Sequence, residues 1–92
     1  MTYQVQLMPE AAQALHRFDK PVTHRIVNKL KWLSQNIEHI TPESLTGEFR
    51  TLYKLRIGSY RVLYTVNRDK HVLVVHLIGH RRDIYRRPKN KF

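Results

Sequence analysis

The residues of this chain that could do chemistry are mostly cations, and they gather in its second half. The sequence does not show the Ser/His/Asp order of a catalytic triad, a pair of catalytic carboxylates or a glycine-rich phosphate loop. The cluster consists of Lys54, Arg56, Tyr60, Arg61, His76, His80, Arg81, Arg82 and Tyr85. Because guanidinium groups make bidentate contacts with phosphate, the cluster predicts a surface that binds a polyanion.

One reaction that such a surface could support is cleavage of RNA without a metal. This reaction needs a base for the ribose 2′-OH, cations that stabilise the charge of the phosphorane, and an acid for the leaving 5′-oxygen. His80 is the first acid–base candidate because histidine titrates near neutral pH, and Tyr85 could stack on an unpaired base. A basic patch with a nearby histidine is more often a binding surface than a nuclease, so the residue types alone favour binding.

A predicted β-hairpin positions the first of these cations. The pair Gly58-Ser59 lies between two alternating apolar runs, which is typical of a two-residue hairpin turn. This register places Arg56 opposite Arg61, with Lys54 on the same face of the sheet. The other face is predicted to carry the apolar set Tyr53, Leu55, Ile57, Tyr60, Val62 and Tyr64.

A second hairpin is predicted to follow, with residues 67–70 as its loop and Val66 facing His71. This register would bring His76 opposite Arg61, so that four basic or titratable side chains share one patch. Like charges opposite one another destabilise a sheet by roughly 0.2–1 kcal/mol per pair. We therefore interpret the patch as an anion-binding surface rather than merely the solvated side of an antiparallel sheet.

The overall charge agrees with a polyanionic partner. The 92 residues contain 17 Lys and Arg against 7 Asp and Glu, a formal net charge of +10. Nucleic acid, or an acidic protein that competes with it, is the predicted partner. A membrane surface is not, because it would call for an amphipathic helix with Lys and Arg on its polar face, and the sequence shows only a core-facing helix. No apolar run approaches the length of a membrane span either.

The absence of cysteine removes disulfides and thiolate zinc sites from consideration. The N-terminal residues lack the pattern of a signal peptide, so we expect a cytoplasmic protein. His16, His24 and His39 lack the spacing of a metal site, and we expect surface or boundary positions for them. Trp32 falls off the main apolar stripe of its helix and is interpreted as a boundary residue of the core.

The N-terminal half supplies the elements that would support the hairpins. Residues 3–7 alternate as in a strand, 9–17 form a short helix, and a second helix runs from Pro21 to about residues 36–38. We expect an α+β fold in which two N-terminal helices, a helical hairpin, pack on a twisted, mainly antiparallel sheet. Residues 1–92 should form a single domain with a basic tail from about residue 86.

Two motifs resemble a known family. The run YKLRIGSYRVLYTV, the segment VHLIGHRRDIY and the elements before them resemble the RelE branch of the RelE/ParE superfamily, toxins of type II toxin–antitoxin systems. The resemblance implies a RelE/ParE-like fold and a metal-independent, ribosome-dependent endoribonuclease that cuts mRNA in the ribosomal A site and inhibits translation. It also implies a cognate antitoxin with an acidic, amphipathic C-terminal segment, and operator DNA as a partner only through that antitoxin. No cofactor is implied.

The resemblance assigns roles to individual residues. Lys54 matches a lysine that assists deprotonation of the 2′-OH, and Arg61 matches the arginine that stabilises charge at the scissile phosphate. Arg81 matches the arginine that assists the leaving group, and Tyr85 the tyrosine that stacks on the substrate base. Arg56 is expected to contact phosphate.

Two positions depart from the best-known RelE enzymes. Leu52 and His80 each stand where those enzymes carry lysine, and His80 could supply an ordinary acid–base group instead. Arg82 and His76 are further candidates for RNA or phosphate binding. Two alternatives remain open: a ParE-like inhibitor of DNA gyrase, which shares the fold but does not need the cluster, and a noncatalytic nucleic-acid-binding module.

Overall fold

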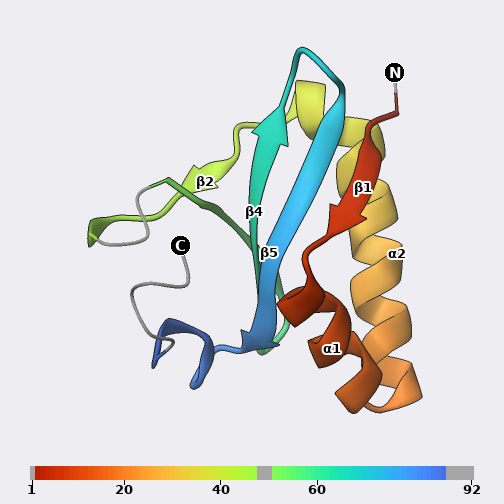
Figure 1. The fold of residues 1–92 in the computed structure, drawn as a ribbon, viewed down its shortest axis with the longest axis vertical. Helices are drawn as coiled ribbons and strands as arrows, with labels where there is room; N and C mark the ends of the chain where they lie inside the picture. Colours follow the sequence, from red (N-terminus) through yellow and green to blue (C-terminus); the bar gives the residue numbers. More distant parts are fainter. Residues whose placement is uncertain (1, 48–50, 87–92) are drawn as a thin grey trace.

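The computed structural model describes residues 2–47 and 51–86. Five strands form one sheet in the order β1-β5-β4-β3-β2, and two α-helices pack against one face of it (Figure 1). In chain order the elements are β1 (Gln4–Leu7), α1 (Pro9–Arg17), α2 (Lys20–Asn36), the 3-10 turn η1 (Ile37–His39), β2 (Glu43–Ser44), β3 (Tyr53–Ile57), β4 (Tyr60–Asn67), β5 (Val72–His80) and the 3-10 turn η3 (Ile84–Arg86).

The predicted α+β class is confirmed. The helices are not the first elements, because strand β1 precedes them. This strand pairs parallel with β5 while the other neighbouring strands are antiparallel, so the sheet is mixed. A parallel pair needs a long crossover, and α1 and α2 lie in the chain segment that links β1 to the other strands. None of the helices in the described ranges is long and apolar enough to cross a bilayer.

The helix bounds follow from local chemistry and agree with prediction to within a residue or two. Pro9 occupies the first turn of α1, where a missing N–H is tolerated, and Glu10 complements the helix dipole. The helix ends where Phe18 adopts an extended backbone. Pro21 likewise lies in the first turn of α2, which begins one residue earlier than predicted, at Lys20.

The main core lies between the helices and the sheet. The buried stripe of α2, from Ile26 to Leu33, and Ile37 of η1 face side chains of β3, β4 and β5. All six side chains predicted for the apolar face of the first hairpin belong to this core or pack against it. Burial on this face therefore fixes which way the hairpin's remaining side chains point.

The register of the first hairpin is confirmed. Ile57 pairs with Tyr60, Arg56 with Arg61, and the φ of Gly58 is 57°. A two-residue turn of this kind needs a positive φ at its first central residue, which glycine adopts without strain.

The register of the second hairpin is not as predicted. Arg61 pairs with Gly79, so the placement of His76 opposite Arg61 was wrong. Two features shift the strands: pairing starts at Asn67 and Val72, and the ladder is irregular between Leu63 and Tyr64. At that irregularity Leu63 pairs with Leu77 and Tyr64 with Val75, which leaves His76 as the extra residue of a β-bulge.

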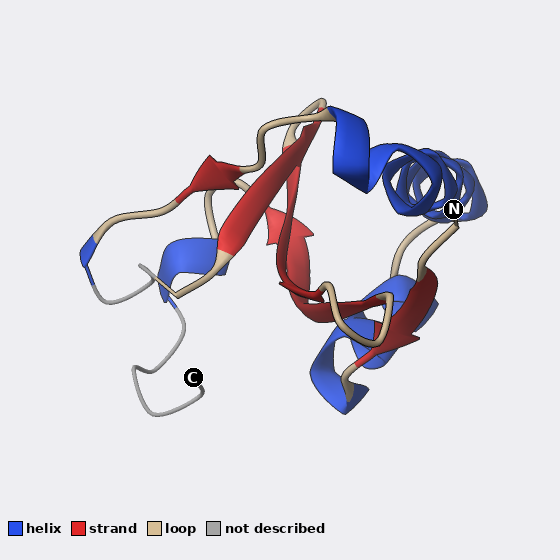
Figure 2. Ribbon diagram, turned by 90° about the horizontal axis from the view of Figure 1, so that it is seen from above, coloured by secondary structure: helices blue, strands red, loops and turns tan. Residues whose placement is uncertain are grey.

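The sheet face away from the helices carries a second, smaller core. It consists of Leu52, Leu63, Leu77 and Ile84, with Leu45 packed against it. Figure 2 shows the helices α1 and α2 on one side of the sheet and the C-terminal 3-10 turn on the other. The segment after η1 leads into β2, a two-residue strand that pairs with β3. Most of the predicted basic tail lies outside the described residues.

Candidate functional site

Three cations share the sheet face away from the helices, as the first hairpin's register predicts. Lys54 and Arg56 lie on β3, and Arg61 lies on β4 directly opposite Arg56. Their sequence neighbours point into the main core, so these side chains alternate to the other face. We call Lys54, Arg56 and Arg61 the basic face.

Lys54 is held by an acid that the sequence analysis did not single out. Its Nζ lies 2.9 Å from Oε2 of Glu43, and its side chain is only 16% exposed. The hydrogen bond from Lys54 is the main cause that lowers the pKa of Glu43. Desolvation opposes it, and the charges of Lys54, Arg56 and Arg61 each lower the pKa further. Glu43 is therefore ionised at neutral pH and sits in the positive potential of the basic face.

Glu43 was missed because its place depends on a pairing that no local pattern indicates. The contact arises because β2 pairs Glu43 with Lys54 across the sheet. A two-residue strand gives no periodicity to read. The available signal in the sequence was an acid, Glu43, ahead of the predicted strand that carries Lys54.

Arg61 is tied to the turn before it. Its Nη1 donates to the carbonyl oxygens of Gly58 and Tyr60, both at 2.8 Å. A guanidinium carries five N–H donors, so these two bonds through one nitrogen leave donors on the other two nitrogens for a phosphate. The turn therefore fixes where the charge of Arg61 lies.

The segment after β5 is anchored to the same turn. The backbone N–H of Arg81 donates to the carbonyl of Ser59 at 2.8 Å, which extends the ladder of β4 and β5 by one step. The structure thus brings Arg81 to the end of the sheet at which Arg61 and Arg56 lie. The side chains of Arg81 and Arg82 are exposed.

His80 lies at this end of the sheet but on the other face. It pairs with Tyr60, and the two rings meet edge to face with centroids 5.6 Å apart. Since Tyr60 packs against the main core, His80 points away from the basic face. Its Nδ1 accepts the N–H of Arg82 at 3.1 Å, which leaves the proton of the neutral ring on Nε2.

His76 is separated from the arginines. Its Nε2 lies 2.9 Å from the hydroxyl of Thr65, which is four positions along β4 from Arg61, or about 13 Å. Burial lowers the pKa of His76. The structure therefore does not bring this residue into the basic face.

Tyr85 is placed by its neighbour. Ile84 is 1% exposed in the second core and lies against Gly79, where an added Cβ would be 3.6 Å from the Cβ of Ile84. This contact docks η3 on the sheet and leaves Tyr85 37% exposed. Leu52 is buried in the same small core, so the leucine that replaces the family's lysine has an apolar environment.

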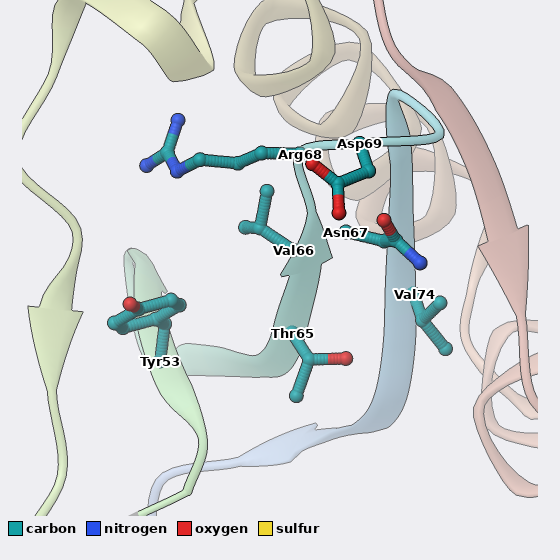
Figure 3. Close-up of a pocket in the computed structure, with 7 residues that line it drawn as sticks. All are labelled: Tyr53, Thr65, Val66, Asn67, Arg68, Asp69 and Val74. Carbon is teal, nitrogen blue, oxygen red and sulfur yellow. The ribbon is translucent and has the colours of Figure 1, made fainter.

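A hollow of about 540 Å³ lies at the other end of β4 and contains none of the predicted site residues. Figure 3 shows Arg68 extending on the side of Tyr53 and Val66, away from Asp69 and Asn67. The residues that line the hollow are Tyr53, Thr65, Val66, Asn67, Arg68, Asp69 and Val74. Across residues 2–47 and 51–86, no group of three or more His, Asp or Glu side chains is arranged to hold a metal ion.

Residues 5–85 match the family model described as the ParE toxin of type II toxin–antitoxin systems, parDE. The chain belongs to this toxin family. The resemblance to the RelE/ParE superfamily is thereby confirmed. A search of curated proteins finds no match to the toxin.

Solved structures similar to the toxin are named as RelE and YoeB proteins. The RelBE2 toxin–antitoxin complex of Mycobacterium tuberculosis has a chain with a TM-score of 0.79 and 24% identity, over 90% of the toxin and 95% of that chain. The archaeal RelE–RelB complex of Pyrococcus horikoshii gives 0.70 and 26%, over 90% and 99%. The YoeB dimer of Staphylococcus aureus gives 0.68 and 21%, over 87% and 98%. The toxin therefore has the RelE-like fold.

Proposed function

We propose that the toxin, acting as a single cytoplasmic domain, is a ribosome-dependent endoribonuclease that cuts mRNA in the ribosomal A site and so inhibits translation. The observation that carries this proposal is the convergence of Lys54, Arg56 and Arg61 on one face, with Arg81 anchored to the same turn. Like charges gather in this way at a cost to the sheet, and a bound phosphodiester offsets that cost.

Each residue has a step in the reaction. Lys54 stabilises the 2′-oxygen while the 2′-hydroxyl gives its proton to solvent water, and Arg61 neutralises the charge that develops on the scissile phosphate. Arg81 assists the leaving 5′-oxygen, and Arg56 contacts a phosphate. Tyr85, on the docked 3-10 turn, stacks on the base that it orients.

His80 and Arg82 belong to the margin of this site. The outer ring nitrogen of His80 carries the proton while Nδ1 is occupied by the backbone of Arg82. Because His80 points to the face that lies away from Lys54 and Arg61, we assign it to contacts with the RNA or ribosome rather than to the proton transfers.

A cognate antitoxin is the partner expected for a type II toxin. Several similar structures are named as toxin–antitoxin complexes, among them RelBE2 of Mycobacterium tuberculosis and YoeB–YefM of Staphylococcus aureus. For a chain with a formal net charge of +10 we propose an antitoxin with an acidic, amphipathic C-terminal segment. Operator DNA would be bound only through that antitoxin.

The proposal is tested by inducing the full chain in translating cells and mapping the 5′ ends of transcripts. We expect cuts in phase with codons, and we expect them to vanish in the Arg61→Ala and Arg81→Ala variants. Transcripts that stay intact while growth stops would contradict the proposal.

A second candidate, a ParE-like inhibitor of DNA gyrase, is favoured by one observation: the family model that matches is that of the ParE toxin. This activity requires no cluster of Lys54, Arg61 and Arg81. The same induction experiment separates the two, because gyrase inhibition produces DNA damage with intact mRNA.

A further inference from the structure

Positive charge continues beyond the basic face onto helix α2. The 17 residues Lys20–Asn36 include no Asp or Glu. Their cationic or titratable side chains are Lys20, His24, Arg25, Lys29 and Lys31. Since a helix exposed on one face normally mixes both signs of charge, a helix without acids repels itself and attracts polyanions.

One cation of α2 reaches the turn between β3 and β4. A Cβ atom built on Gly58 would lie 2.6 Å from Nη2 of Arg25. The guanidinium of Arg25 therefore rests against the bare Cα of the glycine, in space that any other residue would fill. Gly58 thus serves two purposes, the positive φ of the turn and room for Arg25.

Arg61 reaches the same glycine from β4. Its Nη1 donates to the carbonyl of Gly58, so two guanidinium groups from different elements converge on one residue. Within the described part of the chain, neither arginine has a carboxylate at salt-bridge distance. Two positive charges held this close repel one another, and an anion between or beside them removes that repulsion.

We propose that Arg25 binds a backbone phosphate of single-stranded RNA, next along the chain from the phosphate contacted by Arg61. The RNA backbone then crosses the β3–β4 turn from the basic face onto α2. The choice of RNA as ligand rests on the proposed function, while the phosphate site rests on the two guanidinium groups at Gly58.

The test measures binding of the full-length toxin to a short fluorescent single-stranded RNA by anisotropy over a series of salt concentrations. The RNA carries 2′-O-methyl groups, so that it lacks the hydroxyl needed for cleavage. We expect Arg25→Ala to weaken binding about tenfold. We also expect the slope of log K against log salt to become shallower by about 0.7, the value for one phosphate of a single strand.

Arg68→Ala is the matched control. It removes the same charge from an exposed arginine just beyond the other end of β4, about 23 Å along the strand from the turn. We expect its affinity and salt slope to match those of the unchanged toxin. Equal losses of RNA affinity in the two variants would show that only the net charge of the toxin matters, and would overturn the proposal. Unchanged RNA binding in Arg25→Ala would overturn it as well.

Gly58→Asn provides a variant that keeps every charge. Asparagine tolerates a positive φ better than most residues, and its Cβ occupies the place of the Arg25 guanidinium. We expect weaker RNA binding with a melting temperature close to that of the unchanged toxin, because the flexible end of Arg25 can move aside. Full RNA affinity in this variant would count against the site.

Failure of this inference can be told apart from failure of the proposed function. Codon-phased cleavage together with unchanged RNA binding in Arg25→Ala would refute the phosphate site and leave the nuclease standing. Weakened RNA binding in Arg25→Ala with no cleavage of mRNA would do the opposite. Unchanged RNA binding with loss of antitoxin affinity would assign Arg25 to the protein partner and overturn the proposal.

Discussion

The two hairpin ends of β4 carry arginine in different ways. At the β3–β4 turn, Arg61 donates to two backbone carbonyls and Arg81 is bonded through its N–H to Ser59. At the β4–β5 loop, Arg68 is exposed beside Asp69, an acid of opposite charge. The first end holds the arginine charge of Arg61 against a fixed backbone, whereas the second leaves the arginine charge of Arg68 exposed in a loop. Geometry rather than the number of cations distinguishes the candidate site.

The largest expected effect comes from replacing Arg61 with alanine, compared with the same replacement of Arg68. Arg61→Ala should reduce mRNA cleavage about 100-fold or more, because it removes charge stabilisation at the phosphate. Arg68→Ala should leave cleavage within about twofold of the unchanged toxin, as expected for a solvated surface charge. Cleavage of a defined mRNA on purified ribosomes measures both. Equal loss in the two variants would erase the difference between the two ends.

The stability of Arg61→Ala sharpens the same comparison. Removing one of two facing cations relieves repulsion, while the two bonds to the turn are lost. These effects oppose each other, so we expect a net change within about 1 kcal/mol in urea unfolding. A loss of several kcal/mol would indicate a structural role for the guanidinium.

A further effect is expected where the C-terminal turn docks near the first hairpin. Ile84→Ala removes a side chain that is 1% exposed in the second core and should cost about 2 kcal/mol or more. Because the same contact places Tyr85, cleavage should fall as well. Urea unfolding and the ribosome assay check both results. Lower stability with full cleavage would show that the position of Tyr85 is unimportant.

Gly58→Ala tests the backbone of the first turn. Alanine at a φ of 57° should destabilise the toxin by about 1 kcal/mol, measured by thermal unfolding. Gly47→Ala is a useful comparison, since that glycine has a φ of 66° but no atom of the described residues within 4 Å of an added Cβ. If RNA binding falls only in Gly58→Ala, the difference reports the contact with Arg25 rather than backbone strain.

The smallest effect concerns how the stability of the toxin changes as the pH falls below neutral. Burial lowers the pKa of His76 below its usual 6.5, so the unfolded chain takes up this proton at a higher pH than the folded one. Stability linked to His76 is therefore complete above about pH 6.5 and declines as the pH falls toward the lowered value. His76→Gln should flatten this decline in urea midpoints, whereas His16→Gln, an exposed control, should not. An unchanged profile in His76→Gln would contradict the effect of burial.

The first hairpin could be predicted because its register depends on local chemistry. Gly58-Ser59 sets a two-residue turn, and strict alternation then assigns every side chain to a face. The second hairpin has a longer loop and a bulge at His76, and the pattern of apolar residues indicates neither of them. The predicted register included neither feature and therefore placed His76 opposite Arg61, where the structure has Gly79.

Contacts between distant elements were beyond sequence reasoning for a different reason. Glu43 reaches Lys54 only because a two-residue strand adds to the edge of β3. Arg25 reaches Gly58 only because of where α2 lies on the sheet. Periodicity predicts that such elements exist, whereas tertiary packing decides which of their side chains meet.

The chemistry of the cut ends of mRNA tests the central proposal most directly. Attack by the 2′-oxygen on the phosphate, assisted by Lys54, Arg61 and Arg81, must leave a 2′,3′-cyclic phosphate on one fragment and a 5′-hydroxyl on the other. We predict these ends on mRNA cut on ribosomes by the purified full-length toxin. Fragments with 5′-phosphate ends, or mRNA that stays intact while DNA is broken, would contradict the account.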